Sequence, residues 1–248
     1  MSLVGRSVTV TGAGSGIGRG IAERLSREGA LLTVAGRREA PLKELADRLE
    51  GPVRVVAVDV TAPGAARRIV DAAVERYGRL DALVNNAGLA RFAPLEDAEP
   101  ADLDAMVAVH VRAPAELVRR ALPHLRERRG SVVNVSSVGG TLAMPGRAYY
   151  GASKAALNSL TRSLARELAP EVRVNAVLPG PVDTPMWQDA GLTGDQIENL
   201  RTTLLAATPM GRFGTGDEVA RSVCFLLDPE RSGWITGALL PVDGGRTA

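Results

Sequence analysis

The sequence predicts an α/β fold in which helices cover both faces of a parallel sheet of about seven strands. Short apolar runs rich in β-branched residues alternate along the chain with longer amphipathic stretches, a pattern typical of strand–helix–strand units. Most of these runs are almost continuously apolar, as expected of strands buried on both faces. The 248 residues fit one domain, 1–248.

The expected strands and helices follow one another in regular order. The apolar runs that predict strands are 7–11, 31–35, 53–58, 80–84, 131–136, 172–178 and 238–242. The amphipathic stretches that predict helices include 18–27, 39–49, 65–77 and 150–168.

Two segments depart from this alternation. Residues 102–129 form one long helical stretch interrupted by Pro114, where the missing N–H and the ring predict a kink. Residues 184–215 form a long insertion with Trp187, a helix-like piece at 194–205 and Pro209. Long insertions in compact domains are usually functional, so we predict a substrate lid at 184–215.

The composition excludes several classes of protein. Hydrophobic residues make up 45% and charged residues 23%, which are ordinary globular values that exclude a disordered chain. A net charge of +2, from interleaved acids and bases, argues against a nucleic-acid partner. We expect no membrane partner, because no apolar run is long enough for a span and no signal segment is recognisable. Cys224 is the single cysteine, which predicts a reducing cytoplasm, no disulfide and no zinc or other metal site.

The turn after the first expected strand is rich in glycine. Residues 11–18 read TGAGSGIG and open the first expected helix. Glycines let the backbone approach a pyrophosphate closely, and a helix N-terminus offers unpaired N–H groups. The spacing is not G-x-G-x-x-G, but the strand–turn–helix context predicts a Rossmann-type dinucleotide site. Its expected contacts are Gly12, Ser15, Gly16, Ile17 and Gly18.

The end of the second expected strand bears on which dinucleotide binds. An acidic residue there would select NAD by binding the ribose 2′-hydroxyl, but the chain has Gly36, Arg37 and Arg38 instead. A guanidinium suits a phosphate, so we predict NADP(H) rather than NAD(H). The alternative is that both arginines are solvated residues at a helix start. Asp59, at the end of the third strand, could bind the adenine amino group or simply cap a helix.

Further motifs occur along the chain. They are Asp59, the NNAG sequence at 85–88, Ser137, Tyr150-x-x-x-Lys154, Asn175, Pro179-Gly180 and the DGG sequence at 243–245. Together with residues 11–18, they resemble the classical short-chain dehydrogenase/reductase family over essentially the whole chain. The resemblance implies an NADP-dependent carbonyl reductase or alcohol dehydrogenase. It also implies cofactor contacts from Arg37, Arg38, Asp59, Val60, Asn86, Ala87, Gly88, Tyr150, Lys154, Pro179, Gly180, Val182 and Thr184.

Tyr150 and Lys154 lie one helical turn apart on one face of the expected helix. A phenol normally titrates near 10, and a neighbouring ammonium is expected to lower its pKa, which would make Tyr150 a general acid/base. The alternative is an ordinary surface pair. Of the 30 basic residues only Lys43 and Lys154 are lysines, so a surface cation would more often be arginine. The resemblance implies that Ser137, rather than Ser136, binds the substrate oxygen.

One position departs from the family pattern. Where the family usually has a catalytic asparagine, this chain has His110. Pro114 lies four residues on and cannot bond the His110 carbonyl, so a proton-relay water could still bind there. We therefore include His110 as a fourth catalytic candidate that could add a titratable group. The equally weighted alternative is a buried, hydrogen-bonded histidine that fills the asparagine's space.

The substrate pocket is expected between the catalytic residues, 89–92 and the lid. Its expected lining is Phe92, Leu142, Met144, Tyr149, Met186 and Trp187, which predicts a hydrophobic carbonyl or 3-oxoacyl-type substrate. Arg91 and Arg147 weaken that prediction, since either could reach a carboxylate.

The partners are less well determined by the sequence. By analogy with the family we expect a homotetramer or homodimer. Arginines at 119–129 could dock an acidic acyl carrier protein, although a solvated helix end, favoured by the helix dipole, is the preferred explanation. The alternative functions are a non-catalytic NADP(H)-binding sensor or scaffold, and a lyase or epimerase of the same fold.

Overall fold

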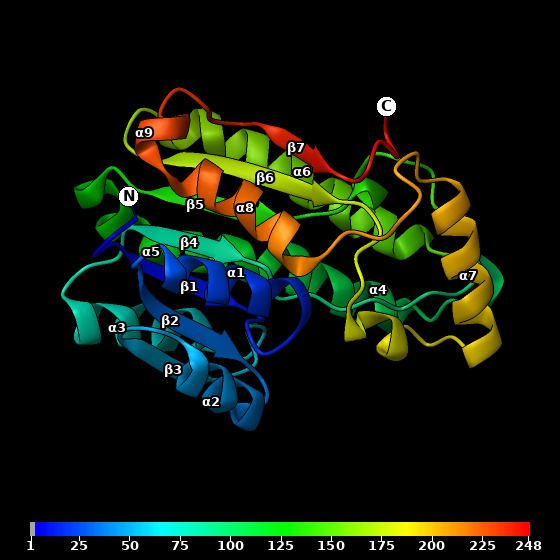
Figure 1. The fold of residues 1–248 in the computed structure, drawn as a ribbon, viewed down its shortest axis with the longest axis horizontal. Coiled ribbons are helices and arrows are strands. Elements are labelled where there is room, and N and C mark those ends of the chain that lie inside the picture. Colours follow the sequence, from blue (N-terminus) through cyan, green and yellow to red (C-terminus); the bar gives the residue numbers. More distant parts are fainter. Residues whose placement is uncertain (1–2) are drawn as a thin grey trace.

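The computed structural model describes residues 3–248, which contain one sheet of seven parallel strands (Figure 1). The strands are β1 (Ser7–Thr11), β2 (Leu31–Gly36), β3 (Val53–Ala57), β4 (Ala82–Asn85), β5 (Ser131–Val135), β6 (Arg173–Pro179) and β7 (Leu239–Val242). Their order across the sheet is β3-β2-β1-β4-β5-β6-β7, and every pairing is parallel. The predicted α/β fold is confirmed, and each strand lies within two or so residues of its predicted place.

Helices pack on both faces of this sheet. In chain order they are α1 (Gly16–Arg27), α2 (Glu39–Arg48), α3 (Ala65–Tyr77), α4 (Pro100–Val107), α5 (Ala113–Arg128), α6 (Ala148–Leu168), α7 (Gly194–Ala206), α8 (Gly216–Leu227) and α9 (Pro229–Ser232). One core lies under α1, α2 and α8 and includes Leu25 and Leu42. The other lies under α3, α5 and α6 and includes Ile69 and Leu117. The apolar strands are therefore covered on both sides, as the sequence predicts.

The chain reverses direction across the sheet next to β1. β2 and β3 lie on one side of β1, whereas β4 lies on the other. The loops after β1 and β4 consequently diverge, which opens a crevice at the carboxyl ends of the strands. Figure 1 shows these ends pointing toward α7. Ligands of parallel α/β sheets bind at this edge.

The break predicted at Pro114 is a π-helical turn, η2 (Ala108–Arg112), between α4 and α5. Pro114 lies in the first turn of α5, where its missing N–H does no harm. The Ala113 N–H bonds the Ala108 carbonyl, five residues back, so the break begins one turn before the proline. His110 lies inside this π turn.

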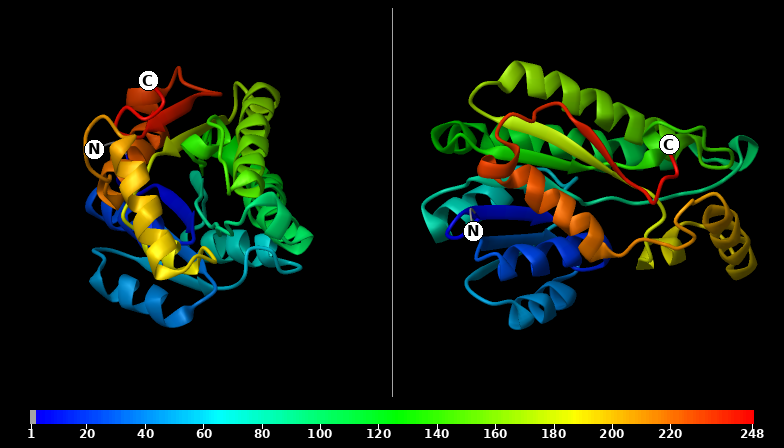
Figure 2. Two further views of the ribbon diagram at one scale, coloured as in Figure 1. Left: turned by 90° about the vertical axis from the view of Figure 1, so that its right-hand side faces the viewer. Right: turned by 45° about the horizontal axis from the view of Figure 1, so that its top comes forward.

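The segment 184–215 contains a 3₁₀ turn, η4 (Pro185–Asp189), then α7 and a loop into α8. In both views of Figure 2, α7 stands beyond the carboxyl edge of the sheet. Only Leu204 of α7 is buried among its described residues, so this helix adds little to either core.

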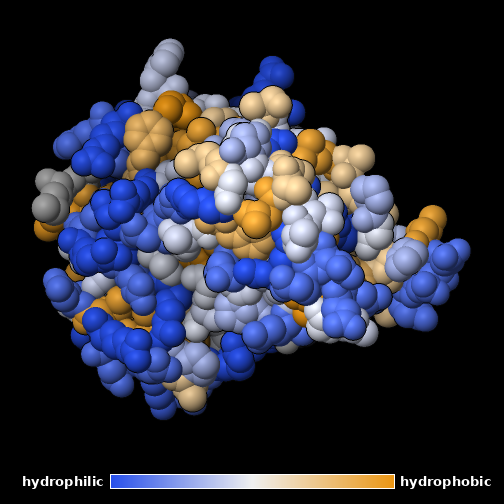
Figure 3. Space-filling view, turned by 45° about the vertical axis from the view of Figure 1, so that its right-hand side comes forward, coloured by the Kyte–Doolittle hydropathy of each residue, from blue (hydrophilic) through white to orange (hydrophobic). Residues whose placement is uncertain are grey.

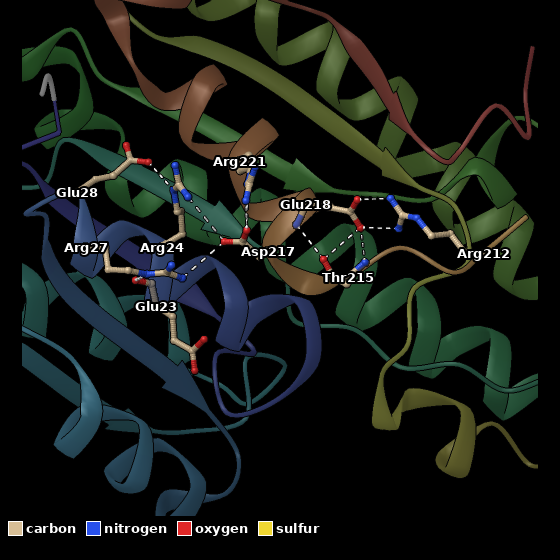
Figure 4. Close-up of polar contacts among 9 residues, drawn as sticks. All are labelled: Glu23, Arg24, Arg27, Glu28, Arg212, Thr215, Asp217, Glu218 and Arg221. Atoms are coloured by element: carbon tan, nitrogen blue, oxygen red, sulfur yellow. Dashed lines mark hydrogen bonds and ion pairs between the residues drawn. The ribbon is translucent and has the colours of Figure 1, made fainter. Parts of the chain in front are cut away.

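The end of this segment is fixed by the cap of α8 (Figure 4). The Thr215 hydroxyl accepts from the Glu218 N–H at 3.3 Å, and the Glu218 carboxylate accepts from the Thr215 N–H at 2.8 Å. Arg212 forms a two-pronged ion pair with the same carboxylate at 2.6 and 3.0 Å. The loop that leads out of 184–215 is thus tied to the first turn of α8.

The first turn of α8 also contacts α1. The Asp217 carboxylate lies within ion-pair distance of Arg24 and Arg27 of α1 and of Arg221 of α8 (Figure 4). The two helices approach so closely that a Cβ on Gly20 would lie 2.8 Å from the Gly216 carbonyl carbon. The helix after the glycine-rich turn and the helix after 184–215 therefore form one packed unit.

Among residues 3–248, no helix is long and apolar enough to cross a bilayer.

Candidate active site

A cavity of about 1080 Å³ runs along the carboxyl edge of the sheet, from the glycine-rich turn to the start of α6. Segments after all seven strands line it, together with 184–188 and Gly191. Every residue predicted to contact a dinucleotide lies in this lining, as do Ser137, Tyr150 and Lys154. His110 lies behind the wall instead. Leu204 and Arg246, which the sequence reasoning missed, also line the cavity.

The glycine-rich turn has the shape that a pyrophosphate requires. A Cβ on Gly18 would lie 2.3 Å from both the Gly12 carbonyl oxygen and the Asn86 amide nitrogen, so only glycine fits there. The Asn86 side chain donates to the carbonyls of Thr11 and Gly12 at 2.9 and 3.2 Å and holds the turn against the loop after β4. Ser15 at the N-cap of α1 makes no side-chain capping bond. The N–H groups of the first turn are thus left for an anion.

Arg37 and Asp59 also line this end of the cavity, and they lie just after β2 and β3. Arg37 is exposed directly after β2. The Asp59 carboxylate accepts from the N–H and hydroxyl of Thr61 at 2.8 and 2.7 Å. Burial alone would raise the pKa of Asp59, but these two hydrogen bonds and the Arg37 cation lower it. These bonds close a local turn, but Asp59 does not cap a helix, because Gly64 is the N-cap residue of α3.

Ser137, Tyr150 and Lys154 meet at the far end of the cavity. The Ser137 side chain lies near the Tyr150 phenol and acts to lower its pKa, and the Ser137 hydroxyl accepts from the Gly139 N–H at 3.0 Å. Lys154 donates to the Val135 carbonyl at 3.0 Å, and its Nζ lies 5.9 Å from the Tyr150 ring centroid. Tyr150 is 9% and Lys154 5% exposed, so the pair is not an ordinary surface pair.

Ser136 points elsewhere. Its hydroxyl donates to the Lys154 carbonyl at 3.3 Å, which ties the end of β5 to α6. Of the two serines, only Ser137 acts on the pKa of the tyrosine.

The electrostatics of the pair differ from the sequence-based expectation. Burial raises the pKa of Tyr150, and this outweighs the opposite effects of Ser137 and the Arg147 cation. The expectation that Lys154 lowers the tyrosine pKa is therefore wrong for the protein without cofactor. The physical reason is that burial also lowers the pKa of Lys154 to about 7, so its cation is only partly present at neutral pH.

His110 is 1% exposed and uses both ring nitrogens. Nε2 accepts from the Leu89 N–H at 3.3 Å, and Nδ1 lies 2.9 Å from the Ser153 hydroxyl. Since a backbone N–H can only donate, Nδ1 carries the proton and donates to Ser153, which in turn donates to the Tyr150 carbonyl at 2.8 Å. Burial and the nearby Lys154 cation lower the His110 pKa well below its usual value. These contacts match the hydrogen-bonded alternative for its side chain.

A chain of buried amides fixes α6 against the sheet. Asn85 donates to Asn134 at 2.8 Å, Asn134 donates to Thr161 at 2.9 Å, and Thr161 donates to the Leu157 carbonyl. The chain therefore links β4, β5 and α6, and it determines where Tyr150 and Lys154 stand relative to Ser137. Asn85 thereby ties β4 to β5.

The apolar wall at the catalytic end consists of Phe92, Met144, Met186 and Trp187. The Phe92 ring meets Tyr150 edge-on at 5.5 Å and Trp187 at 6.5 Å between centroids. Two predicted members lie elsewhere: Leu142 packs in a small cluster with Val138, and Tyr149 lines a separate pocket. Both side chains are turned away because the 3₁₀ turn after Ser137 and the helix α6 direct them to other faces.

The molecular surface seen in Figure 3 carries both hydrophilic and hydrophobic residues. In Figure 3 hydrophilic residues dominate the left and lower parts, and hydrophobic residues form several small groups in the upper part. The arginines at 119–129 belong to the opposite edge of the sheet, because they directly precede β5 at its start. Arg120 and Arg128 also pair with Asp71 and Glu127. They give no support for a docking surface beside the cavity.

Comparisons with known proteins agree with this geometry. The model of a family described as enoyl-(acyl carrier protein) reductase matches residues 12–247. The 3-oxoacyl-[acyl-carrier-protein] reductase FabG of Thermotoga maritima is 38% identical over 250 residues, 99% of each chain. The 2-(S)-hydroxypropyl-CoM dehydrogenase 3 of Xanthobacter autotrophicus is 36% identical over 97% of this chain and 96% of its own. The crystal structure of 3-ketoacyl-(acyl-carrier-protein) reductase from Brucella melitensis, complexed with NADH, superposes with a TM-score of 0.92 at 34% identity over 100% of both chains.

Proposed function

The chain belongs to the classical short-chain dehydrogenase/reductase family and is an oxidoreductase of it, and we propose that it transfers a hydride between NADP(H) and a ketone or secondary alcohol. The observation that supports this most is the meeting of Ser137, Tyr150 and Lys154 at one end of a cavity whose other end is a glycine-rich helix N-terminus. The named relatives act on different substrates, so the family alone does not determine this one.

The nicotinamide, when bound, supplies or accepts the hydride at the carbonyl carbon. Tyr150 gives its phenolic proton to the carbonyl oxygen, so one C–H and one O–H bond form as the C=O double bond becomes single. A raised pKa keeps Tyr150 protonated at neutral pH, which suits a proton donor in the reducing direction. In this proposal the Ser137 hydroxyl, which lines the cavity beside Tyr150, donates to the same carbonyl oxygen and orients it.

In this proposal Lys154 helps Tyr150 to give up its proton and to regain it. An amine with a pKa of about 7 takes up and releases protons close to physiological pH. As a cation it stabilises the phenolate that Tyr150 leaves behind. The His110 carbonyl remains a candidate site for a relay water, while the His110 ring acts by position through Leu89 and Ser153.

The preference for NADP(H) rests on the mouth next to β2. Arg37 is exposed there, and neither of its neighbours, Gly36 and Arg38, carries a carboxylate. A phosphate on the adenosine ribose would therefore meet a guanidinium and no opposing acid. The apolar wall of Phe92, Met144, Met186 and Trp187 supports a hydrophobic or 3-oxoacyl-type carbonyl substrate. Residues 184–215 act as its lid. Exposed alanines on α6, at 152, 155 and 156, fit the expected dimer or tetramer contact.

The test is loss of nicotinamide absorbance with NADPH and with NADH over a panel of ketones, diketones and 3-oxoacyl thioesters. We expect turnover with NADPH, and a roughly 10²- to 10⁴-fold lower kcat in Tyr150→Phe because only the proton donor is lost. Tyr149→Phe is the matched control, since Tyr149 lies outside the cavity and should behave like the wild type.

Other results would favour the alternative functions. NADPH binding without turnover of any carbonyl would indicate a sensor or scaffold. A changed product without net change in cofactor would indicate a lyase or epimerase. Equal activity of Tyr150→Phe and Tyr149→Phe would overturn the proposed role of Tyr150.

A further inference from the structure

Two arginines face the substrate end of the cavity. Arg147 is the N-cap residue of α6, three residues before Tyr150, and Arg246 follows β7 near the end of the chain. Both line the cavity and both are half-buried. The Arg147 guanidinium carbon lies 5.8 Å from the centroid of the Phe92 ring, the same ring that meets Tyr150. This cation is therefore close to the reacting group.

Neither of these cations has an acidic partner among the described side chains. Other arginines on this side of the molecule do: Arg91 lies 3.9 Å from Asp102, and Arg201 lies 3.0 Å from Asp183. Arg246 donates to the Leu204 carbonyl at 3.4 Å, a neutral acceptor. Burial and the like charge of Arg246 lower the pKa of Arg147. The fold thus keeps two cations near each other at an electrostatic cost.

The dinucleotide does not account for them. Its phosphates would meet the glycine-rich turn and Arg37, at the opposite end of the cavity from α6. An anion on the substrate would lie between Arg147 and Arg246 and supply the missing opposite charge.

Resting on the proposed function above, we propose that the substrate carries an anionic group, a carboxylate or sulfonate, a few bonds from the reacting carbonyl, and that Arg147 binds it with Arg246. The short spacing follows from Phe92, whose single ring contacts both Tyr150 and Arg147. The substrate's apolar part packs against Phe92 and Trp187.

The experiment compares each oxo acid with its own neutral ester. The probes are acetoacetate and ethyl acetoacetate, levulinate and ethyl levulinate, and 2-oxopropanesulfonate for the sulfonate case. We expect wild-type kcat/KM to be higher for one of the acids than for its ester. Arg147→Gln should lower kcat/KM for that acid roughly 10- to 100-fold more than for the ester, because the ester loses only the effect of the Arg147 cation on Tyr150, whereas the acid also loses its charged hydrogen bonds.

Variants separate charge from shape. Arg147→Lys keeps the positive charge and should retain part of the preference for the acid, and Arg246→Gln should weaken it less than Arg147→Gln. Arg48→Gln is the matched control, because Arg48 is an exposed residue of α2 that pairs with Glu44. Equal losses on acid and ester in Arg147→Gln, or a wild-type preference for esters throughout, would overturn the inference.

A binding measurement keeps this inference separate from the proposed function. Titration calorimetry of the protein without cofactor, with acetoacetate, levulinate and 2-oxopropanesulfonate, needs no turnover. Binding of one of them to the wild type and its loss in Arg147→Gln would support the anion site even if no ketone were reduced. No binding of any of them to the wild type would refute the site, whatever the enzyme reduces.

Discussion

At the scale of single residues, burial decides the chemistry of the catalytic end. Tyr150 and Lys154 sit one turn apart, yet the same low-dielectric surroundings raise the pKa of one and lower the pKa of the other. Both shifts favour the neutral forms.

Lys154 should make the stability of the unliganded protein depend on pH. Its pKa is about 7 in the folded chain but near 10.5 in the unfolded one, so below pH 7 both states are protonated and the burial cost is fully present. Between these values the unfolded state binds more protons, and stability rises with pH. Lys154→Met should therefore be more stable than the wild type at pH 6, by on the order of 3 kcal/mol, and the difference should shrink by pH 9.5.

Urea unfolding at the two pH values measures this. Lys43→Met is the matched control, because Lys43 is exposed and pairs with Glu39 at the surface. Its effect should be small at both pH values. A Lys154→Met effect that is the same at pH 6 and 9.5 would contradict a lowered lysine pKa.

His110 stands where the family usually has asparagine. Its side chain holds the surrounding segments together but adds no group that titrates near neutral pH. Its two hydrogen bonds join the loop after β4 to α6, and they require the neutral ring. A histidine with a pKa well below its usual value does not titrate near neutral pH.

At the scale of elements, the helix caps determine how the lid joins the rest of the fold. The cap of α8 combines a reciprocal Thr215–Glu218 bond pair with the Arg212 ion pair, and it lies where 184–215 ends. The same turn packs against α1, whose own N-terminus faces the cavity. The segment 184–215 and the proposed cofactor site are thereby attached to one helix pair.

Removing the Glu218 carboxylate should test this junction. Glu218→Ala loses the cap and the ion pair and should lower the free energy of unfolding by about 1 kcal/mol, whereas Glu218→Gln keeps the cap geometry and should lose about half of that. The pKa of Glu218 is lowered to about 2, so its contribution is present above the unfolded value of 4.5 and is lost as pH falls through about 2.

Urea denaturation at pH 7 checks the expected order. Glu75→Ala, an exposed residue within α3, is the matched control and should change stability little. If Glu218→Gln proved as costly as Glu218→Ala, the ion pair and not the cap would account for the effect.

At the scale of the whole molecule, one cavity collects loops from nearly the full length of the sheet. A ligand that fills it contacts both halves of the fold and should stabilise both together. At about 100 times its Kd, NADPH should add about 2.7 kcal/mol and raise Tm by roughly 5–10 °C.

Two nucleotides, compared by the same thermal-unfolding measurement, test whether Arg37 binds the ribose phosphate. 2′,5′-ADP carries the ribose phosphate and 5′-AMP does not, so only the former should gain from the guanidinium. Arg37→Ala should remove that gain and leave the effect of 5′-AMP unchanged. Equal Tm shifts from the two nucleotides in the wild type would show that Arg37 does not read the phosphate.

Much of the fold was predictable because its signals are local. Continuous apolar runs and 3.6-residue periodicity predict all seven strands and the main helices within the described chain. The π turn was predictable only as a break, since its register depends on packing around His110. The pocket wall was only partly predictable: the directions of Leu142 and Tyr149 depend on a 3₁₀ turn that has no clear sequence signal.

The sequence by itself determined the α/β architecture, and it was enough to propose the dinucleotide cradle and the roles of Ser137, Tyr150 and Lys154, because each depends on spacing along one or two neighbouring elements. Only the tertiary structure decided the direction of the Tyr150 pKa, the tautomer of His110 and the placement of Arg147 and Arg246 in one cavity. These properties depend on burial and on contacts between residues far apart in the chain. Spacing along the sequence carries no information about either.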